Sequence, residues 1–310
     1  MRAQNPEISV IVPVRNDRPG LATLLGRLAD QSLDDARYEV IVVDDGSSDG
    51  SADLARRPGV SVMRTAGQGH GSYAARNLGL NVATANVLAF TDADCVPAHD
   101  WLERGLSKVT EGSNRLVAGH IEVPLSDRPS SAAIIDVARH LDQERAVRDG
   151  FCATANLFVP REVFDRVGMF NDQLISGGDG EFGNRATSAG FSLHYAPDAV
   201  VNHPPRSDRV QLARKAYRLG YGAAQQRVYA EGPLRKRPHI CRRPGAYVPH
   251  FRFDARPRLQ RRGANLTWRQ QATAQVVEYL FVQLPIAFGN LVGTVRSRPA
   301  GDSRRQSVIS

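Results

Sequence analysis

Residues 87–94 read VLAFTDAD, a short apolar run that ends in two aspartates one residue apart. A run of this kind predicts a strand that is buried on both faces of a sheet. The same construction occurs twice upstream, where residues 8–14 read ISVIVPV and residues 38–43 read YEVIVV before a polar turn. Stretches of helical spacing, such as the leucines of 20–31, separate these runs. The sequence therefore predicts an α/β fold with a mostly parallel central sheet flanked by helices.

The rest of the chain predicts further elements, which become less regular toward the C-terminus. We expect strands at 60–64, 116–123, 151–159 and 191–195, and helices at 51–56, 74–83, 131–147, 161–167, 180–189 and 211–229. Residues 232–265 are rich in Pro and Arg without a clear period, which predicts an irregular basic segment. Residues 276–295 are strongly apolar, and we expect residues 299–310 to be disordered.

Charge is distributed unevenly along the chain. Residues 1–204 hold 19 basic and 27 acidic residues, whereas residues 205–310 hold 21 basic and 5 acidic ones. A basic third of this kind attracts phospholipid head groups, nucleic acid or anionic substrates. The three cysteines, Cys95, Cys152 and Cys241, form neither a disulfide framework nor a zinc-binding spacing. Together with an N-terminus that lacks a signal-peptide pattern, this predicts a cytoplasmic protein.

The two aspartates after the strand at 87–90 are the strongest chemical signal. Asp92 and Asp94 can share a divalent ion such as Mg²⁺, whose remaining ligands are water and the oxygens of a substrate phosphate. The alternative is a pair of exposed turn acids. A position at the carboxyl end of a buried strand favours the metal site, because ligands of parallel sheets bind at that edge.

Two further polar segments lie next to predicted elements, one after the second strand and one at the start of the helix predicted at 74–83. Asp44 and Asp45 come directly after the second strand and can accept hydrogen bonds from a nucleotide base or ribose, although Asp, Ser and Gly there also favour a turn and a helix cap. Residues 67–77 read GQGHGSYAARN, in which alternate glycines let backbone N–H groups approach an anion and Arg76 can pair with phosphate. This segment is neither a P-loop nor a dinucleotide-binding fingerprint.

Together these segments resemble glycosyltransferase family 2. The resemblance covers about residues 8–225 and rests on four ordered motifs: Pro13-Val14-Arg15-Asn16 after the first strand, Val-Asp-Asp-Gly-Ser at 43–47, Ala-Arg-Asn-x-Gly at 75–79, and Asp-x-Asp at 92–94. It implies a GT-A fold, and the sequence beyond residue 225 adds a basic, helical C-terminal extension. We therefore expect a catalytic domain at 1–230 (nucleotide-sugar half 1–120, acceptor half 121–230), a basic segment at 231–265, an apolar helical segment at 266–298 and a tail at 299–310.

The same resemblance implies roles for residues of the nucleotide-sugar half. A nucleoside-diphosphate sugar, linked to UDP, GDP or TDP, would be bound by Pro13, Asn16, Asp44, Asp45, Arg76 and Asp92. Mg²⁺ or Mn²⁺ would be held by Asp92, Asp94 and His203, with Asp94 as the main direct ligand. His203 has a simpler alternative as a polar turn residue. The metal ion would neutralise charge on the nucleoside-diphosphate leaving group.

In the acceptor half, residues 178–185 read GDGEFGNR and align with the family's Glu-Asp-x-Glu-Leu-x-x-Arg. This implies that Asp179 is the general base for the acceptor hydroxyl, with Glu181 and Arg185 beside it. Gly178 departs from the motif, and Asp179 can alternatively cap its helix. Asn156 matches a recurrent asparagine, and Trp101 either floors the sugar pocket or belongs to the core.

The apolar segment at 276–295 has the length of a bilayer core but contains Glu278, and arginines flank it on both sides. We expect a kinked amphipathic segment in peripheral contact with the cytoplasmic face of a membrane, the alternative being a helical hairpin packed on the catalytic domain. A glycan or lipid-linked acceptor would suit such membrane contact, and an inverting transfer follows from the resemblance and the single candidate base. The competing hypotheses are a nucleotidyltransferase, an inactive scaffold and a nucleic-acid-binding protein. The last is disfavoured because no aromatic residues are interleaved with the arginines.

Overall fold

The computed structural model describes residues 5–67, 69–139, 142–229, 254–261 and 266–297. Two compact units divide the chain. The first, the sheet unit, consists of Met1–Asp127, Arg139–Asp172 and Gly178–Pro205, and the second, the helical unit, of Arg128–Ala138, Gln173–Gly177 and Arg206–Ser310. The predictions for 231–253, 262–265 and 299–310, which include Cys241, lie outside the described residues.

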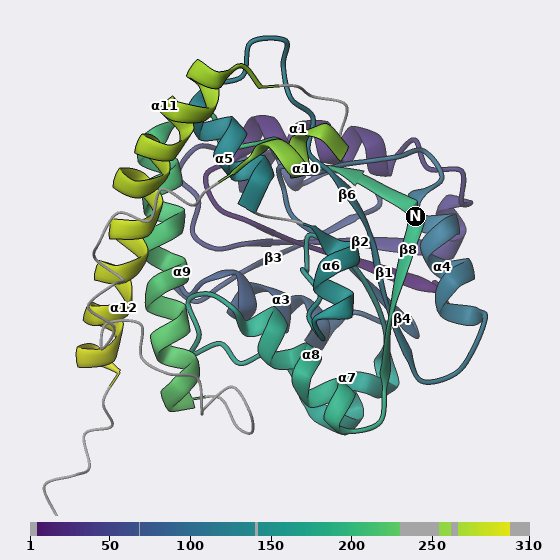
Figure 1. Cartoon of the computed structure of the whole chain (residues 1–310). Helices are drawn as coiled ribbons and strands as arrows, with labels where there is room; N and C mark the ends of the chain where they lie inside the picture. The colour runs from purple at the N-terminus through teal and green to yellow at the C-terminus, as the bar shows by residue number, and fades with distance from the viewer. Residues whose placement is uncertain (1–4, 68, 140–141, 230–253, 262–265, 298–310) are drawn as a thin grey trace, which may run out of the picture. The chain divides into compact units, whose positions relative to one another are not determined.

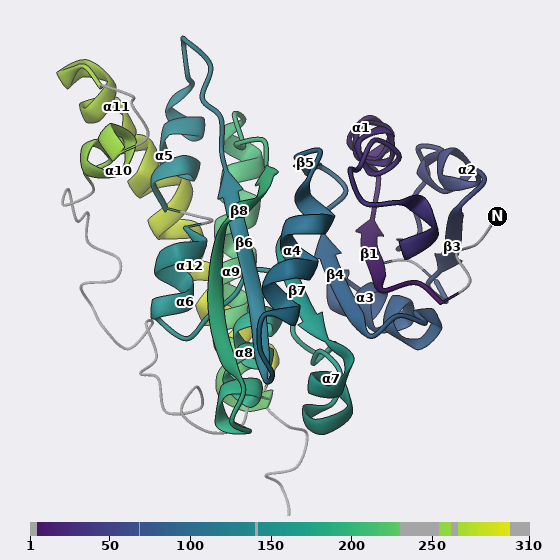
Figure 2. The ribbon, with the colours of Figure 1, turned by 90° about the vertical axis from the view of Figure 1, so that its right-hand side faces the viewer.

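The sheet unit is built on one eight-stranded sheet in the order β3-β2-β1-β4-β7-β6-β8-β5. Figure 2 shows these strands side by side from β3 to β8. Their bounds are Ile8–Val14 (β1), Tyr38–Asp44 (β2), Val60–Arg64 (β3), Val87–Thr91 (β4), Val96–Pro97 (β5), Arg115–Glu122 (β6), Asn156–Pro160 (β7) and Ser192–Asn202 (β8).

The first four strands form the parallel part of the sheet. β1 lies between β2 and β4, and β2 pairs with β3, all in parallel register. Strands β2 and β4 are buried along their whole length, as continuous apolar runs require. Because parallel strands end at the same edge, the turns after β1, β2 and β4 are brought together there. Asn16, Asp45, Asp92 and Asp94 lie in these turns and Asp44 ends β2, whereas Arg76 lies in the helix Ser72–Val82 and His203 follows β8.

Helices of the sheet unit pack on the strands that they connect. They are α1 (Arg18–Leu28), η1 (Asp35–Arg37), α2 (Ser51–Ala55), α3 (Ser72–Val82), α4 (Trp101–Thr110), α6 (Gln143–Arg148), α7 (Arg161–Val167) and α8 (Gly178–Ser188). Helix α3 contacts β1 and β2, whereas α4 contacts β6, β7 and β8. The mostly parallel sheet flanked by helices was predicted from the sequence and is confirmed.

The second half of this sheet differs from the prediction in detail. Helix α4 was not predicted, although its buried residues recur at helical spacing. Strand β7 begins at Asn156 instead of residue 151, and it runs antiparallel to β4 and β6. Strand β8 continues to Asn202 because its pairing with β6 shifts register after Ala196, so that Pro197, which has no N–H, lies in the irregularity.

The helical unit contains α5 (Ser131–Arg139, except its last residue), α9 (Arg209–Tyr229), α10 (Arg256–Arg261), α11 (Trp268–Glu278), η5 (Tyr279–Gln283) and α12 (Leu284–Arg296). Helix α10 falls in the segment that was expected to be irregular. The predicted helix at 131–147 is divided into α5 and α6.

The last three elements are continuous, and we call Trp268–Arg296 the long C-terminal helix. Thr267 caps it, its side chain accepting a hydrogen bond from the Gln270 N–H while the Gln270 side chain bonds back. In length and composition its 29 residues could cross a membrane, but 39% of its most apolar window is buried. In Figure 1 it runs beside α9, with which it is in contact.

Candidate active site

Asn16 joins the turns that follow β1 and β2. Its φ of 52° lies in the left-handed region, which asparagine tolerates better than most residues. Its side-chain oxygen accepts a hydrogen bond from the Ser48 N–H at 2.8 Å, and its own N–H donates to Ser47 Oγ at 2.9 Å. Pro13 is the penultimate residue of β1 and lies opposite Val43. The Pro-x-x-Asn motif therefore fixes one turn against the other.

Asp44 and Asp45 are both buried at the end of β2. Asp44 accepts hydrogen bonds from Ser47 N–H at 3.0 Å and from Arg64 Nε at 2.8 Å. Burial acts to raise the pKa of Asp44, but these hydrogen bonds outweigh it and hold the pKa below its usual value. Asp44 therefore stays ionised at the edge of the sheet.

Asp45 organises the glycine-rich loop before α3. Its carboxylate accepts hydrogen bonds from Thr65 Oγ1 at 2.9 Å, from the His70 N–H at 3.1 Å and from the Gly71 N–H at 3.0 Å. Gly71 has a φ of 93°, which favours glycine. By holding this loop, Asp45 sets where α3 begins and so where its residue Arg76 lies.

Arg76 is the buried cation of the site, with 3% of its surface exposed. One terminal nitrogen donates to Asp92 Oδ1 at 2.5 Å, and the guanidinium lies 5.7 Å from the centre of the Tyr73 ring. Its Nε has no hydrogen-bond partner among the described residues. Since a buried donor without a partner is costly, Arg76 has capacity to bind a further anionic group.

Asp179, at the start of α8, faces the same arginine. Tyr73 donates its hydroxyl to Asp179 Oδ1 at 3.1 Å. Desolvation raises the pKa of Asp179, and the positive charge of Arg76 and the Tyr73 hydrogen bond only partly oppose it. A carboxylate whose pKa is raised in this way is a stronger base than an exposed aspartate, which suits proton abstraction.

Tyr73 also accounts for Gly178, the position at which the sequence departs from the family motif. A Cβ at Gly178 would lie 2.8–3.0 Å from three atoms of the Tyr73 ring. The tyrosine therefore fills the space that a side chain at 178 would need. Sequence reasoning missed Tyr73 because its contact with Asp179 joins positions 106 residues apart.

Asp94 and His203 form a candidate metal site with Cys95 beside them. The possible ligand atoms of these three residues lie within 4.8 Å of one another, and His203 Nε2 is 3.6 Å from Asp94 Oδ1. His203 Nδ1 lies 2.9 Å from the Pro204 carbonyl, so it carries the proton and leaves Nε2 free to coordinate. The carboxylate oxygen fits either Mn²⁺ or Mg²⁺, and the imidazole nitrogen favours Mn²⁺, because Mg²⁺ prefers oxygen ligands.

Cys95 and Asp92 are less suited to bind the metal ion than Asp94 and His203. Burial, with the charges of Asp92 and Asp94 as lesser causes, raises the pKa of the Cys95 thiol well above its usual value. Sulfur is also a softer ligand than Mg²⁺ or Mn²⁺ prefers. Asp92, expected from the sequence to share the ion, lies against Arg76 and outside this group of three.

Trp101 and Asn156 lie inside the sheet unit. Both are fully buried, and the Trp101 indole N–H donates to Asn156 Oδ1 at 2.8 Å. The Asn156 amide donates in turn to the carbonyls of His120 and Ala199, each at 2.8 Å. They present no side-chain surface to a sugar here, so the core alternative describes Trp101, and Asn156 joins β6, β7 and β8.

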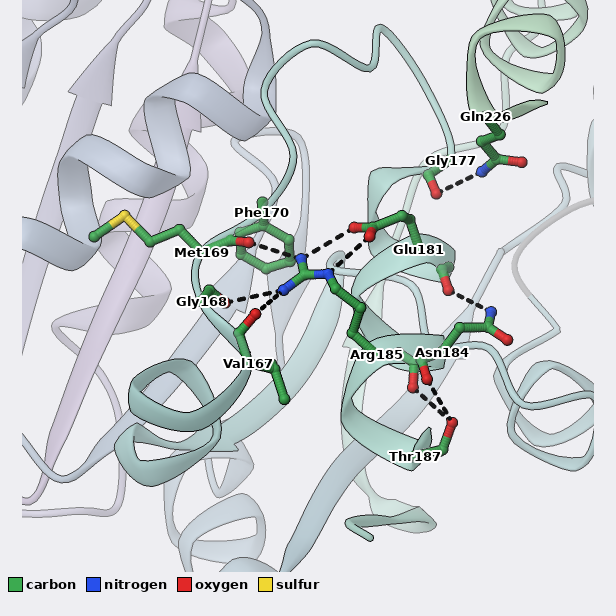
Figure 3. Close-up of polar contacts among 12 residues, drawn as sticks. Val167, Gly168, Met169, Phe170, Gly177, Glu181, Asn184, Arg185, Thr187 and Gln226 are labelled. Atoms are coloured by element: carbon green, nitrogen blue, oxygen red, sulfur yellow. Dashed lines mark hydrogen bonds and ion pairs between the residues drawn. The ribbon is translucent and has the colours of Figure 1, made fainter. Parts of the chain in front are cut away.

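Buried Glu181 and partly exposed Arg185 form a latch on α8 (Figure 3). Arg185 donates from Nε to Glu181 Oε1 at 2.7 Å and from a terminal nitrogen to Glu181 Oε2 at 3.0 Å. Its guanidinium also donates to the backbone carbonyls of Val167 and Met169 in the segment after α7. The latch holds this segment to the helix that carries Asp179, so both residues position the candidate base.

Replacing Arg185 by alanine is expected to lower the free energy of unfolding by about 3 kcal/mol, because it leaves the buried Glu181 carboxylate unpaired. Urea denaturation followed by circular dichroism measures this. The control is Arg145→Ala, which breaks an exposed pair with Asp149 at 3.5 Å and should cost less than about 0.5 kcal/mol. Equal stability of the two variants would refute the latch.

The chain is similar in sequence to known glycosyltransferases. The family model described as Glycosyl transferase family 2 matches residues 9–168. Glycosyltransferase AglE of Haloferax volcanii is 36% identical over 230 residues, which cover 73% of this chain and 75% of that protein. An undecaprenyl-phosphate 4-deoxy-4-formamido-L-arabinose transferase of Serratia proteamaculans is 32% identical over 141 residues, 42% of each chain.

Among solved structures, the mannosyltransferase PcManGT of Pyrobaculum calidifontis, in complex with GDP-Man and Mn²⁺, has a similar fold. The TM-score is 0.60 at 19% sequence identity, and the similarity covers 94% of this chain and 88% of that one.

Proposed function

Because the chain belongs to glycosyltransferase family 2, we propose that it transfers one sugar from a nucleoside diphosphate to an acceptor hydroxyl. The reaction would use a divalent metal ion and invert the configuration of the sugar carbon. That the chain is a glycosyltransferase of GT-A-like fold follows from the match and confirms the predictions of family and fold class. The nucleotidyltransferase alternative is thereby removed.

One observation carries the proposal: buried Arg76 contacts Asp92 and lies over the ring of Tyr73, whose hydroxyl donates to Asp179. The carboxylate expected at the donor and the carboxylate expected to act on the acceptor are therefore connected through Arg76 and Tyr73. The Nε of Arg76 has no partner among the described residues and is itself buried, so a donor phosphate oxygen would reach it once the groups around it move. Donor and acceptor groups would then meet around Arg76.

The residues have the following roles in the proposal. Asp94 and His203 would hold Mg²⁺ or Mn²⁺, which stabilises the charge on the departing nucleoside diphosphate. Asp179 takes the proton of the acceptor hydroxyl as that oxygen attacks the sugar carbon, while Tyr73 orients the carboxylate. Asp44 and Asp45 would accept hydrogen bonds from base and ribose, and Arg64, an exposed partner of Asp44, would move aside.

The donor and acceptor are proposed at the level of class. A UDP-, GDP- or TDP-linked sugar is supported by the GDP-Man and Mn²⁺ bound to the structural neighbour. A lipid-linked or glycan acceptor is supported by the relative that is named an undecaprenyl-phosphate transferase. A location at the cytoplasmic face of a membrane is proposed to go with such an acceptor.

Thermal unfolding in the presence of UDP, GDP, TDP or CDP, each with and without Mn²⁺, tests the proposed function. We expect one nucleotide to raise the unfolding midpoint and to do so only with metal, because a ligand at 100 times its Kd stabilises the folded state by about 2.7 kcal/mol. Inorganic phosphate with Mn²⁺ is the control for unspecific anion binding. Folded protein that responds to none of the nucleotides would support the inactive scaffold instead.

A further inference from the structure

Within the helical unit, α9 and the long C-terminal helix pack with their backbones unusually close. A Cβ added at Gly289 would collide with the Tyr217 carbonyl, and one at Gly220 with the Ile286 carbonyl. A Cβ at Gly293 would lie 2.9 Å from the Tyr221 carbonyl oxygen. Gly289 and Gly293 are four residues apart on one helix face, a spacing that allows close helix contact in apolar surroundings.

An ordinary surface helix exposes its polar residues, whereas the long C-terminal helix buries several of them. Three polar residues, Gln271, Glu278 and Asn290, are buried. Asn290 donates to the Gly220 carbonyl at 3.1 Å, and Gln283 donates to Glu278 at 2.6 Å. The inner face therefore combines glycines and hydrogen-bonded polar groups with apolar residues.

The outer face of the same helix is a stripe of large apolar residues, each between 42% and 62% exposed: Val276, Leu280, Phe288, Leu291 and Val295. Their spacing of three, four or eight residues places them on one side of the helix. In water a helix turns such a face inward, so this outward apolar stripe, over an inner face that holds buried polar groups, indicates an apolar partner or medium on the outer side.

A groove of about 480 Å³ between the two helices continues this stripe. It shares Leu280 and Phe288 with the stripe, and the remaining lining residues are Val210, Ala213, Arg214, Tyr217, Leu284 and Pro285. Apart from Arg214 and the Tyr217 hydroxyl, these side chains are apolar. The groove is thus largely apolar and offers a hydrocarbon chain few polar competitors.

Charge selects the class of partner. Exposed arginines border the apolar face at 209, 214 and 218 on α9 and at 269 and 296 on the long helix. The only acidic residue in the sequence of either helix is Glu278, which is buried. Two copies of so basic a face would repel each other, whereas anionic lipid head groups would attract it.

We infer that the pair formed by α9 and the long helix docks on an anionic bilayer, with the stripe at the head-group and acyl boundary and the arginines on lipid phosphates. The helices lie on the surface and do not span, because the basic side chains of α9 would be costly at the centre of the hydrocarbon. This inference does not depend on the proposed transfer reaction.

Sedimentation with vesicles of phosphatidylcholine and phosphatidylglycerol tests the docking, in the absence of any nucleotide sugar. The full chain is expected to sediment with these vesicles. The variant Phe288→Glu/Leu291→Glu should bind at least about tenfold more weakly, because it places two charges in the apolar boundary. Both positions are exposed, so the variant should fold.

Val82→Glu/Met169→Glu is the matched control, since it also adds two charges at exposed apolar positions, but in the sheet unit. It should bind like the parent chain. The emission of Trp268, the exposed one of two tryptophans, should shift to shorter wavelength on binding. A folded double variant that binds like the parent, a parent that binds no vesicle, or a dimer that the variant dissociates would each overturn the inference.

Discussion

Asp179→Asn is expected to lower the turnover number about a thousandfold or more and to leave nucleotide binding nearly unchanged. The amide cannot take the proton of the acceptor hydroxyl, but it keeps the size of the side chain and can still receive the Tyr73 hydroxyl. Steady-state kinetics with the donor identified by thermal unfolding, together with nucleotide titration, measures both quantities.

The effect of Asp179→Asn on the stability of the fold follows from the pKa of Asp179 in the parent chain. The pKa of Asp179 is raised by desolvation in the folded protein, so folding favours the protonated form. That contribution is complete below the unfolded pKa and is lost as the pH rises through the folded one. At neutral pH the ionised carboxylate therefore costs stability, and Asp179→Asn should unfold at the same temperature as the parent or a higher one.

For the parent, the acidic limb of kcat/KM against pH should lie above the usual titration range of an aspartate, and the variant should lack this limb. Asp198→Asn, on an exposed face of β8, is the control and should behave like the parent. Loss of nucleotide binding equal to the loss of turnover would show that Asp179 is not the base.

Asp94→Ala is the second change with a large expected effect. It removes the carboxylate that faces His203 at 3.6 Å, and with it the metal site that stabilises the leaving group. We expect turnover to fall by about three orders of magnitude and the nucleotide to lose its Mn²⁺-dependent stabilisation. The carboxylate is 37% exposed, so the fold itself should tolerate the change.

His203→Ala should weaken the apparent Mn²⁺ affinity and leave some activity at high Mn²⁺ concentration, since one of two protein ligands remains. Asp100→Ala removes an equal charge six residues away, from an exposed pair with Arg104, and serves as the control. Unaltered Mn²⁺ dependence in Asp94→Ala would place the metal ion elsewhere.

The part of the fold that the sequence predicted is the part governed by local pattern. The apolar runs of β1, β2 and β4 are buried on both faces, and such strands are recognisable without any knowledge of their partners. The turns after them were predicted as the site for the same reason, because the edge of a parallel sheet gathers its C-terminal turns.

What the sequence did not predict depends on contacts between distant segments. The antiparallel pairing of β7 is set by its neighbours β4 and β6 and leaves no local pattern. The contact of Asn156 with Trp101 and the fixing of the glycine-rich loop by Asp45 likewise exist only in the folded chain. The cytoplasmic location stays a prediction.

Gly178 and Tyr73 have a consequence for how this site can change during evolution. A glutamate at 178 would collide with Tyr73. A smaller residue at 73 would remove the hydroxyl that donates a hydrogen bond to Asp179. The two positions are thus coupled: a side chain at 178 requires a smaller residue at 73, and that change would remove the hydrogen bond to Asp179.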